Sequence, residues 1–114
     1  MTKNNHINYI EFIANDLQIT KTFYSKCFGW IFTDYGPNYT SFSDSGISGG
    51  FEKSDKEIKN GALAVIHHSN LEYILEVIKD NGGTIVVDIF SFPGGRRFQF
   101  KDPSGNELAV WTED

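Results

Sequence analysis

The chain of 114 residues repeats one pattern of secondary structure twice, and this repeat constrains the fold more than any other feature. Each half reads as a strand, a helix and three further strands. The turn FSDSG at Phe42–Gly46 in the first half corresponds to FKDPSG at Phe100–Gly105 in the second. A solenoid needs several repeats to bury a continuous core. Two copies therefore predict a pseudo-symmetric pair of curved sheets.

In the first half, Ile7–Ala14 is predicted to be a strand because apolar residues alternate along it. Asp16 is expected to cap a helix that ends at Gly29, since Asp is a preferred N-cap and Gly a preferred C-terminal stop. The polar stretch Glu52–Asn60 is predicted to be a surface linker. Three strands and a turn lie between the helix and the linker: Trp30–Tyr35, Asn38–Ser43, Asp44-Ser45-Gly46 and Ile47–Glu52.

In the second half, Ala62–His68 is predicted to be a strand, and Ser69 or Asn70 to cap a helix that ends at Asn81-Gly82-Gly83. This helix has an apolar stripe at helical spacing, formed by Leu71, Ile74, Leu75 and Ile78. Another strand, Thr84–Phe90, follows the helix. A hairpin of two strands closes the half, with the turn-forming sequence DPSGN between them: Arg96–Lys101 and Glu107–Thr112.

Charge and composition exclude several classes of protein. The net charge of −5 and the single basic pair Arg96-Arg97 argue against non-specific binding of nucleic acid. No apolar run is long enough to span a membrane. Cys27 is the one cysteine, so no internal disulfide can form, and we expect it to be a small buried hydrophobe. With no secretory signal at the start, these features predict a cytoplasmic protein.

Several motifs together resemble the vicinal oxygen chelate superfamily of glyoxalase I, extradiol dioxygenases, and fosfomycin and bleomycin resistance proteins. The first helix carries Asp16-Leu17, Phe23-Tyr24 and Phe28-Gly29, and the second helix ends in Asn-Gly-Gly. The closing motif Phe-x-Asp-Pro-x-Gly-Asn consists of Phe100, Asp102, Pro103, Gly105 and Asn106.

The resemblance implies an α+β fold in which two βαβββ modules form a cup-shaped curved sheet with the helices outside. The modules would span residues of about 6–53 and about 61–113, within a single glyoxalase-like domain over residues 1–114. Members of the superfamily commonly dimerise, so the resemblance also implies a homodimer.

Metal-dependent members of the superfamily hold their metal with four ligands, usually His, Gln or Glu, on the first and last strand of each module. The resemblance carries these positions to Tyr9, Gly50, Leu63 and Ala109. Divalent metals of this class favour imidazole or carboxylate ligands. Three of the four residues have no side-chain donor atom, and the phenol of Tyr9 is a poor ligand at neutral pH. The sequence therefore predicts no metal and no other cofactor.

One alternative keeps a divalent metal, held by residues outside the family positions: Glu11, Glu52, His67 and Glu107. Against it, His67 and His68 are neighbours on one strand and point to opposite faces, so they cannot share an ion.

Strand alternation predicts which side chains face away from the helices and line the cup. The predicted lining combines aromatic and polar groups: Tyr9, Glu11, Tyr39, Ser41, Val65, His67, Arg97, Gln99, Glu107 and Trp111. Aromatic rings can stack on a planar ligand, and an arginine can hold a carboxylate or phosphate. Purely structural roles are the alternatives for three of these residues: Glu11 could pair with Arg97, Glu107 could be solvated, and Trp111 could pack in the core or in a dimer.

Three functions follow from these residues. The leading hypothesis is a metal-independent protein that binds a small planar or anionic molecule, such as a metabolite or an antibiotic. The second is an enzyme of the same superfamily, lactoylglutathione lyase-like or isomerase-like, with Glu11 as the base and Arg97 holding the resulting anion. The third is a structural or interaction module, which would require the cup to be filled by the protein's own side chains.

Overall fold

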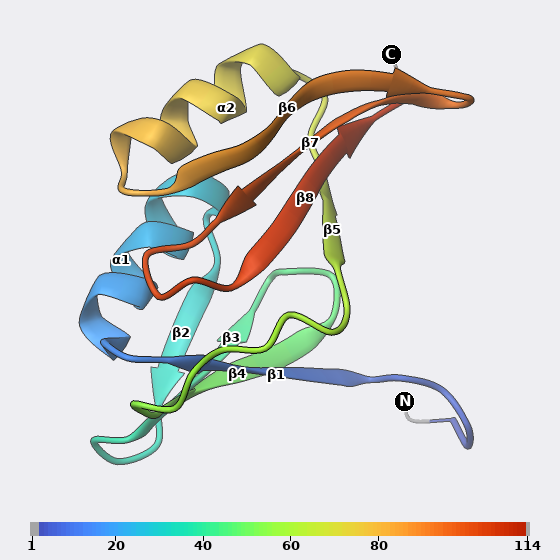
Figure 1. The fold of residues 1–114 in the computed structure, drawn as a ribbon. Coiled ribbons are helices and arrows are strands. Elements are labelled where there is room, and N and C mark those ends of the chain that lie inside the picture. The colour runs from blue at the N-terminus through green and yellow to red at the C-terminus, as the bar shows by residue number, and fades with distance from the viewer. Residues whose placement is uncertain (1–2, 114) are drawn as a thin grey trace. The chain divides into compact units, whose positions relative to one another are not determined.

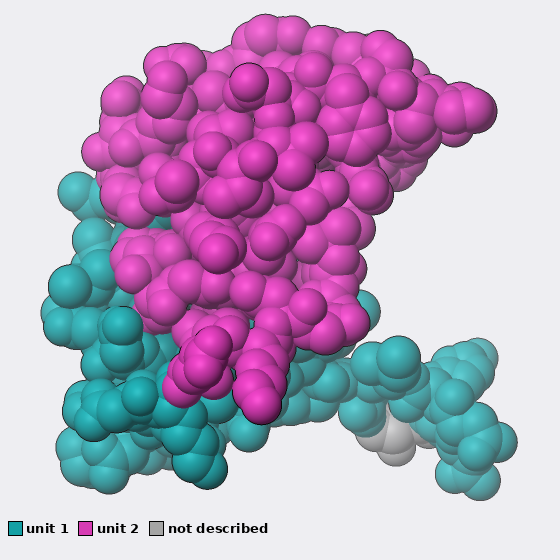
Figure 2. Space-filling view, in the orientation of Figure 1, with its two compact units in different colours: residues 1–56 teal, residues 57–114 magenta. Residues whose placement is uncertain are grey.

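The computed structural model describes residues 3–113. The chain divides into two compact units, residues 1–56 and 57–114, shown in teal and magenta in Figure 2. Each unit contains one helix and one four-stranded sheet, which confirms the α+β class and the repeat of two βαβββ modules. The cup between the modules and the homodimer stay predictions.

Unit 1 has a four-stranded sheet in the order β1-β4-β3-β2. The first strand pairs with the last in parallel, and the other neighbours are antiparallel. The parallel pair is possible because a helix connects β1 to the rest of the sheet. Its elements, labelled in Figure 1, are β1 (Tyr9–Ala14), α1 (Leu17–Phe28), β2 (Ile31–Asp34), β3 (Tyr39–Ser43) and β4 (Ser48–Lys53).

Unit 2 repeats this topology with the order β5-β8-β7-β6, again with the first and last strands parallel. The predicted strands of both units are all present, with ends that differ by at most two residues. One difference concerns the site: β5 begins at Ala64, so Leu63 precedes the strand and is exposed. The elements are β5 (Ala64–His67), α2 (Leu71–Asp80), β6 (Thr84–Phe92), β7 (Gly95–Lys101) and β8 (Glu107–Thr112).

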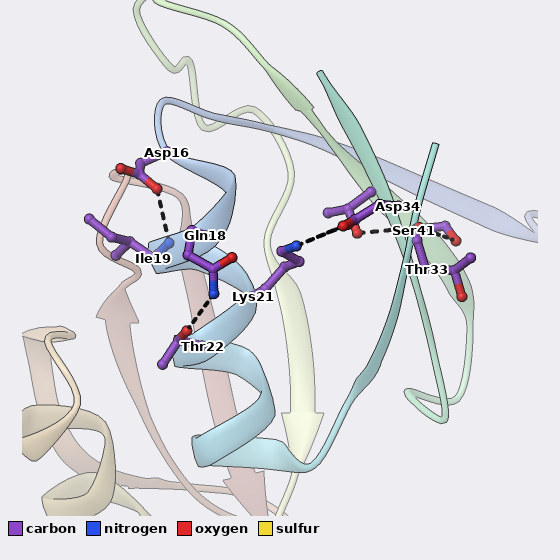
Figure 3. Close-up of polar contacts among 9 residues, drawn as sticks. Asp16, Gln18, Ile19, Lys21, Thr22, Thr33, Asp34 and Ser41 are labelled. Atoms are coloured by element: carbon purple, nitrogen blue, oxygen red, sulfur yellow. Dashed lines mark hydrogen bonds and ion pairs between the residues drawn. The ribbon is translucent and has the colours of Figure 1, made fainter. Parts of the chain in front are cut away.

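Both helices begin where the sequence indicates. Asp16 Oδ1 accepts a hydrogen bond of 3.0 Å from the Ile19 backbone, as Figure 3 shows, and α1 stops before Gly29 at φ +73°. Asn70, rather than Ser69, caps α2 by accepting from the Tyr73 backbone at 3.1 Å. Neither helix has the length and apolar character that a membrane crossing would require, among the residues that the structure describes.

The core of unit 1 is aromatic. Tyr24 of α1 is fully buried and stacks on Trp30 at 4.7 Å between ring centroids. Trp30 in turn stacks on Phe42 at 4.6 Å, and Phe51 contacts both Tyr24 and Phe42. Cys27 is buried on the same side of the helix, as predicted. Burial raises the pKa of its thiol to about 12, so the thiolate is strongly disfavoured.

The core of unit 2 is formed by the apolar stripe of α2 and one face of its sheet. Three of the four predicted stripe residues, Leu71, Ile74 and Ile78, are fully buried, and Leu75 is partly exposed. The sheet contributes four side chains from the closing hairpin, all at most 1% exposed: Phe98, Phe100, Leu108 and Val110. These four residues alternate along the hairpin with the residues predicted to line the cup, as expected for the opposite face.

A buried carboxylate organises the turn of the closing hairpin. Asp102 Oδ1 accepts from the backbone of Ser104, Gly105 and Asn106 at 2.9–3.0 Å. Its Oδ2 accepts from the side chain of Asn106 at 3.0 Å. Asp102 and Asn106 are each 4% exposed. Because these bonds fix the reversal, they also fix the register of β7 against β8.

We predict that Phe100→Ala and Phe42→Ala each lower the free energy of unfolding by about 3–5 kcal/mol, because both rings are buried at corresponding places in the two units. The matched control is Phe90→Ala, which removes a ring that is 37% exposed and should cost clearly less. Urea denaturation measures all three. Equal midpoints for Phe100→Ala and Phe90→Ala would contradict this account of the core.

We also predict that Gly105→Val destabilises the protein by about 1–3 kcal/mol, because Gly105 has φ +108° and a β-branched residue resists that conformation. Space is not the cause, since an added Cβ would lie 3.9 Å from its nearest neighbour, Ile58. Gly61→Val is the control: an added Cβ there meets nothing within 4 Å, and no positive φ is involved. Equal melting temperatures for the two variants would show that the turn tolerates substitution.

Candidate functional site

We call the face of each sheet opposite its helix the open face of that unit. In unit 1, the register places Glu11, Gly50 and Ser41 in one row across β1, β4 and β3. Tyr9 and Tyr39 project from the same face, because they lie two residues from Glu11 and Ser41 on their strands. The Ser41 hydroxyl donates to the backbone carbonyl of Thr33 at 3.5 Å, near the Lys21–Asp34 ion pair in Figure 3.

Two tyrosines and a carboxylate form a hydrogen-bonded group on this face, which we call the Tyr–Glu cluster (Tyr9, Tyr39 and Glu11). The hydroxyl of Tyr39 donates to Glu11 Oε1 at 3.0 Å, and the hydroxyls of Tyr39 and Tyr9 are 2.5 Å apart. Burial, followed by the hydrogen bonds with Tyr9 and Glu11, raises the pKa of Tyr39 above its ordinary value. Tyr39 therefore stays protonated at neutral pH and keeps its donor.

Gly50 makes room for the cluster. A Cβ atom at this position would overlap the hydroxyl of Tyr39 and would lie 2.7 Å from that of Tyr9. Any side chain on Gly50 would thus displace the two hydroxyls.

In unit 2, two rows cross the open face. The first contains Val65, Ala109 and Gln99, and the second contains His67, Trp111 and Arg97. The predicted site residues of this unit thus share one face, as alternation predicted. Glu107 also lies on it, two residues from Ala109 on β8.

The guanidinium of Arg97 lies over the ring of Phe90, with 5.3 Å between its Cζ and the ring centroid. Its Nε atom is buried and has no hydrogen-bond partner among the described residues. Its neighbour Arg96 is on the opposite face and binds Glu72 of α2 through Nη1 and Nη2, at 2.6 and 3.4 Å. Arg96 therefore forms an ion pair with α2, whereas Arg97 faces the other side of the sheet.

The other polar residues of this face have partners from the same unit. Gln99 Nε2 donates to Glu107 Oε2 at 2.6 Å, so Glu107 is half-buried and bonded rather than simply solvated. His67 Nε2 is hydrogen-bonded to Glu113 Oε1 at 2.6 Å, and its ring meets Trp111 edge-on at 5.5 Å. The partner of Glu11 in the structure is Tyr39, and a pairing of Glu11 with Arg97 stays a prediction.

Sequence reasoning missed two residues of this face for different reasons. Glu113 could have been found, because it lies two residues beyond Trp111 and alternation continues past the strand end. The pairing of Phe90 with Arg97 could not, because β6 has two register shifts against β7, one between Ile85 and Val87 and one between Val87 and Phe90. Such shifts change which residues lie opposite each other, and nothing in the sequence locates them.

The residues at the four family positions do not fit a metal. Gly50 and Ala109 occupy corresponding rows of the two sheets, and neither carries a donor atom. Leu63 is an exposed hydrocarbon, and the hydroxyl of Tyr9 is engaged with Tyr39. Over residues 3–113, no three His, Cys, Asp or Glu side chains gather in a group that could hold an ion.

Two open surface pockets lie beside the helices and away from the open faces. The pocket in unit 1 has a volume of about 440 Å³, and the one in unit 2 about 460 Å³. Neither is lined by a predicted site residue. Their linings are Gln18, Lys21, Thr22, Ser25, Lys26 and Phe32 in unit 1, and Leu75, Lys79, Gly83, Thr84, Ile85 and Asp88 in unit 2.

Comparison with solved structures shows proteins of the same fold. A glyoxalase/bleomycin resistance protein/dioxygenase family enzyme from Burkholderia phytofirmans PsJN superposes with a TM-score of 0.83 and 13% identity, over 94% of this chain and 98% of that one. A genomically encoded fosfomycin resistance protein from Listeria monocytogenes gives a TM-score of 0.80 and 17% identity, over 96% and 94%.

Sequence comparison shows the family. A glyoxylase-like domain-containing protein from Didymella fabae is 31% identical, over 98% of this chain and 97% of that relative. The family model of the Glyoxalase/Bleomycin resistance protein/Dioxygenase superfamily matches residues 6–110. The chain therefore belongs to the glyoxalase/bleomycin resistance protein/dioxygenase superfamily.

Proposed function

We propose that the protein binds a small planar molecule bearing a carboxylate or phosphate on the open face of unit 2, without a metal. The observation that carries this proposal is the guanidinium of Arg97. It lies over the ring of Phe90, and its Nε atom is buried with no hydrogen-bond partner among the described residues. The neighbouring Arg96, by contrast, forms an ion pair with the carboxylate of Glu72. The two arginines therefore differ in their surroundings, although they are the same residue type.

An arginine in this state favours an incoming anion. Packing on a ring removes water from one side of the guanidinium, which strengthens its interaction with a negative charge. Two of its nitrogens can donate to one carboxylate or phosphate in a fork geometry. The anion would thus supply the acceptors that the chain itself does not.

Aromatic residues near Arg97 support a planar ligand. Trp111 is paired with Arg97 in the register, and both its ring and that of Phe90 are partly exposed. Partly exposed aromatic rings bind flat molecules by stacking. Gln99 and Glu107 add hydrogen-bonding groups beside the anion position, and such placed polar groups commonly orient a ligand.

We predict that protein purified without added metal holds far less than one equivalent of zinc, nickel, iron or manganese. Chelators should leave its melting temperature unchanged, since the family positions offer no adequate ligand set. Elemental analysis and a thermal melt with and without EDTA measure these two quantities. A stoichiometric metal that survives dialysis would contradict the metal-free proposal.

We further predict that benzoate and phenyl phosphate bind, and that benzamide, the neutral analogue of benzoate, binds much more weakly. Arg97→Gln should weaken benzoate binding by roughly one to two decades, because a charged hydrogen-bond partner is worth about 1.5–3 kcal/mol. Trp111→Ala should weaken all three probes, because it removes a stacking surface. NMR titration gives each affinity, and melting curves report whether the variants fold.

The matched control for this experiment is Arg96→Gln, which removes the same charge from the neighbouring residue on the opposite face. Its benzoate affinity should equal that of the wild type. The proposal is wrong if neither anion binds the wild-type protein. It is also wrong if Arg97→Gln and Arg96→Gln, both folded, change benzoate affinity equally.

A further inference from the structure

We infer that the Tyr–Glu cluster of unit 1 is a binding site for the protonated nitrogen of an organic ammonium or guanidinium group. This site goes beyond the proposed function, because it takes the opposite charge and uses none of the residues around Arg97. It has three supports: the direction of the hydrogen bonds, the charge of the open face, and the exposure of the ring of Tyr9.

The direction of the hydrogen bonds follows from counting protons. A tyrosine hydroxyl has one proton, and that of Tyr39 is donated to Glu11 Oε1. The short contact between the two hydroxyls must then use the proton of Tyr9, with Tyr39 accepting. Both donors of the cluster are therefore spent within it. What remains for a ligand is a lone pair on Tyr9 and the second oxygen of Glu11, so the cluster can only accept.

The donor of Tyr39 would be lost if its hydroxyl were deprotonated. Burial and its hydrogen bonds raise the pKa of Tyr39, so the hydroxyl stays intact near neutral pH. The acceptor character of the cluster is thus stable under ordinary conditions. A ligand anion would meet a carboxylate and lone pairs, and would be repelled.

The open face of unit 1 around the cluster carries further negative charge. Register and alternation place Glu52, two residues from Gly50 on β4, on the open face with Glu11. Lys53 and Asp34 belong to the helix side by the same rule, and Asp34 is paired there with Lys21. No lysine or arginine in the described strands of unit 1 falls on the open face. A cation approaching it therefore meets no opposing charge from the sheet.

The cluster is also accessible and aromatic. Tyr9 is 44% exposed and Glu11 is exposed, so a ligand can reach both. An ammonium or guanidinium placed against a tyrosine ring gains a cation–π interaction in addition to its hydrogen bonds. The cluster also depends on glycine at position 50, because a Cβ atom there would displace the hydroxyls of Tyr39 and Tyr9.

The test uses benzylammonium as the probe and benzyl alcohol as its neutral analogue, titrated into the full chain at low salt by NMR. Benzylammonium should shift the amide signals of β1, β3 and β4, and benzyl alcohol should not. Glu11→Gln should weaken benzylammonium binding at least about tenfold, because the acceptor facing the ligand becomes an amide that can donate. Tyr9→Phe, which keeps the ring and removes the oxygen, should weaken it several-fold.

Glu52→Gln is the matched control, because it removes the same charge from the same face but from outside the hydrogen-bonded cluster. It should reduce benzylammonium affinity far less than Glu11→Gln and with a stronger dependence on salt. Melting curves establish that each variant is folded. Equal losses in the two variants would reduce the site to a diffuse negative surface and overturn the inference. So would an absence of benzylammonium binding, or shifts confined to other strands.

The two proposals fail separately. Benzoate with Arg97→Gln tests unit 2, and benzylammonium with Glu11→Gln tests unit 1. Loss of benzylammonium binding in Arg97→Gln, with Glu11→Gln unaffected, would place the cation site elsewhere and contradict the assignment to the cluster.

Discussion

The packing of each helix against one face of its sheet is the constraint on which the remaining structure depends. Buried rings and aliphatic side chains hold β-strand register, because a slip of one residue would move every buried group to the solvent side. In unit 1 the aromatic stack from Tyr24 through Trp30 to Phe42 serves this purpose. In unit 2 the strand register is held by the packing of α2 against the closing hairpin. Asp102 fixes the turn of that hairpin. Because the helix fixes which face of each sheet is packed, it also fixes which side chains lie on the open face.

Of the residues at the four family positions, only Tyr9 carries a side-chain donor atom. At Gly50 the space of a side chain is taken by tyrosine hydroxyls, and the carboxylate nearby is engaged by one of them. The corresponding position of unit 2, Ala109, is fully buried and carries only a methyl group. The open faces of the two units thus share topology but not chemistry.

The sites that we propose on the two open faces favour ligands of opposite charge. The donor without a partner on Arg97 is its Nε–H, whereas in the Tyr–Glu cluster the groups left over are acceptors on Tyr9 and Glu11. This contrast arises from equivalent strands: Tyr39 and Arg97 occupy corresponding positions of β3 and β7, since Ser41 and Gln99 pair with Gly50 and Ala109. The carboxylate differs as well, because Glu11, the partner of Gly50, corresponds to Val65, the partner of Ala109. These differences underlie the opposite charge preferences that we propose for the two faces.

The sequence by itself determined the repeat, both helices, the cap at Asp16, the helix-facing side of β1, β5, β7 and β8, and the turn at Asp102, because these depend on local periodicity and turn chemistry. It also determined which residues stand at the family positions. Only the tertiary structure decided the side-chain partners: Tyr39 with Glu11, Gln99 with Glu107, and Arg97 with Phe90 across a bulge. Such pairings depend on rotamers and on two register shifts in β6, and the sequence pattern carries no signal for either.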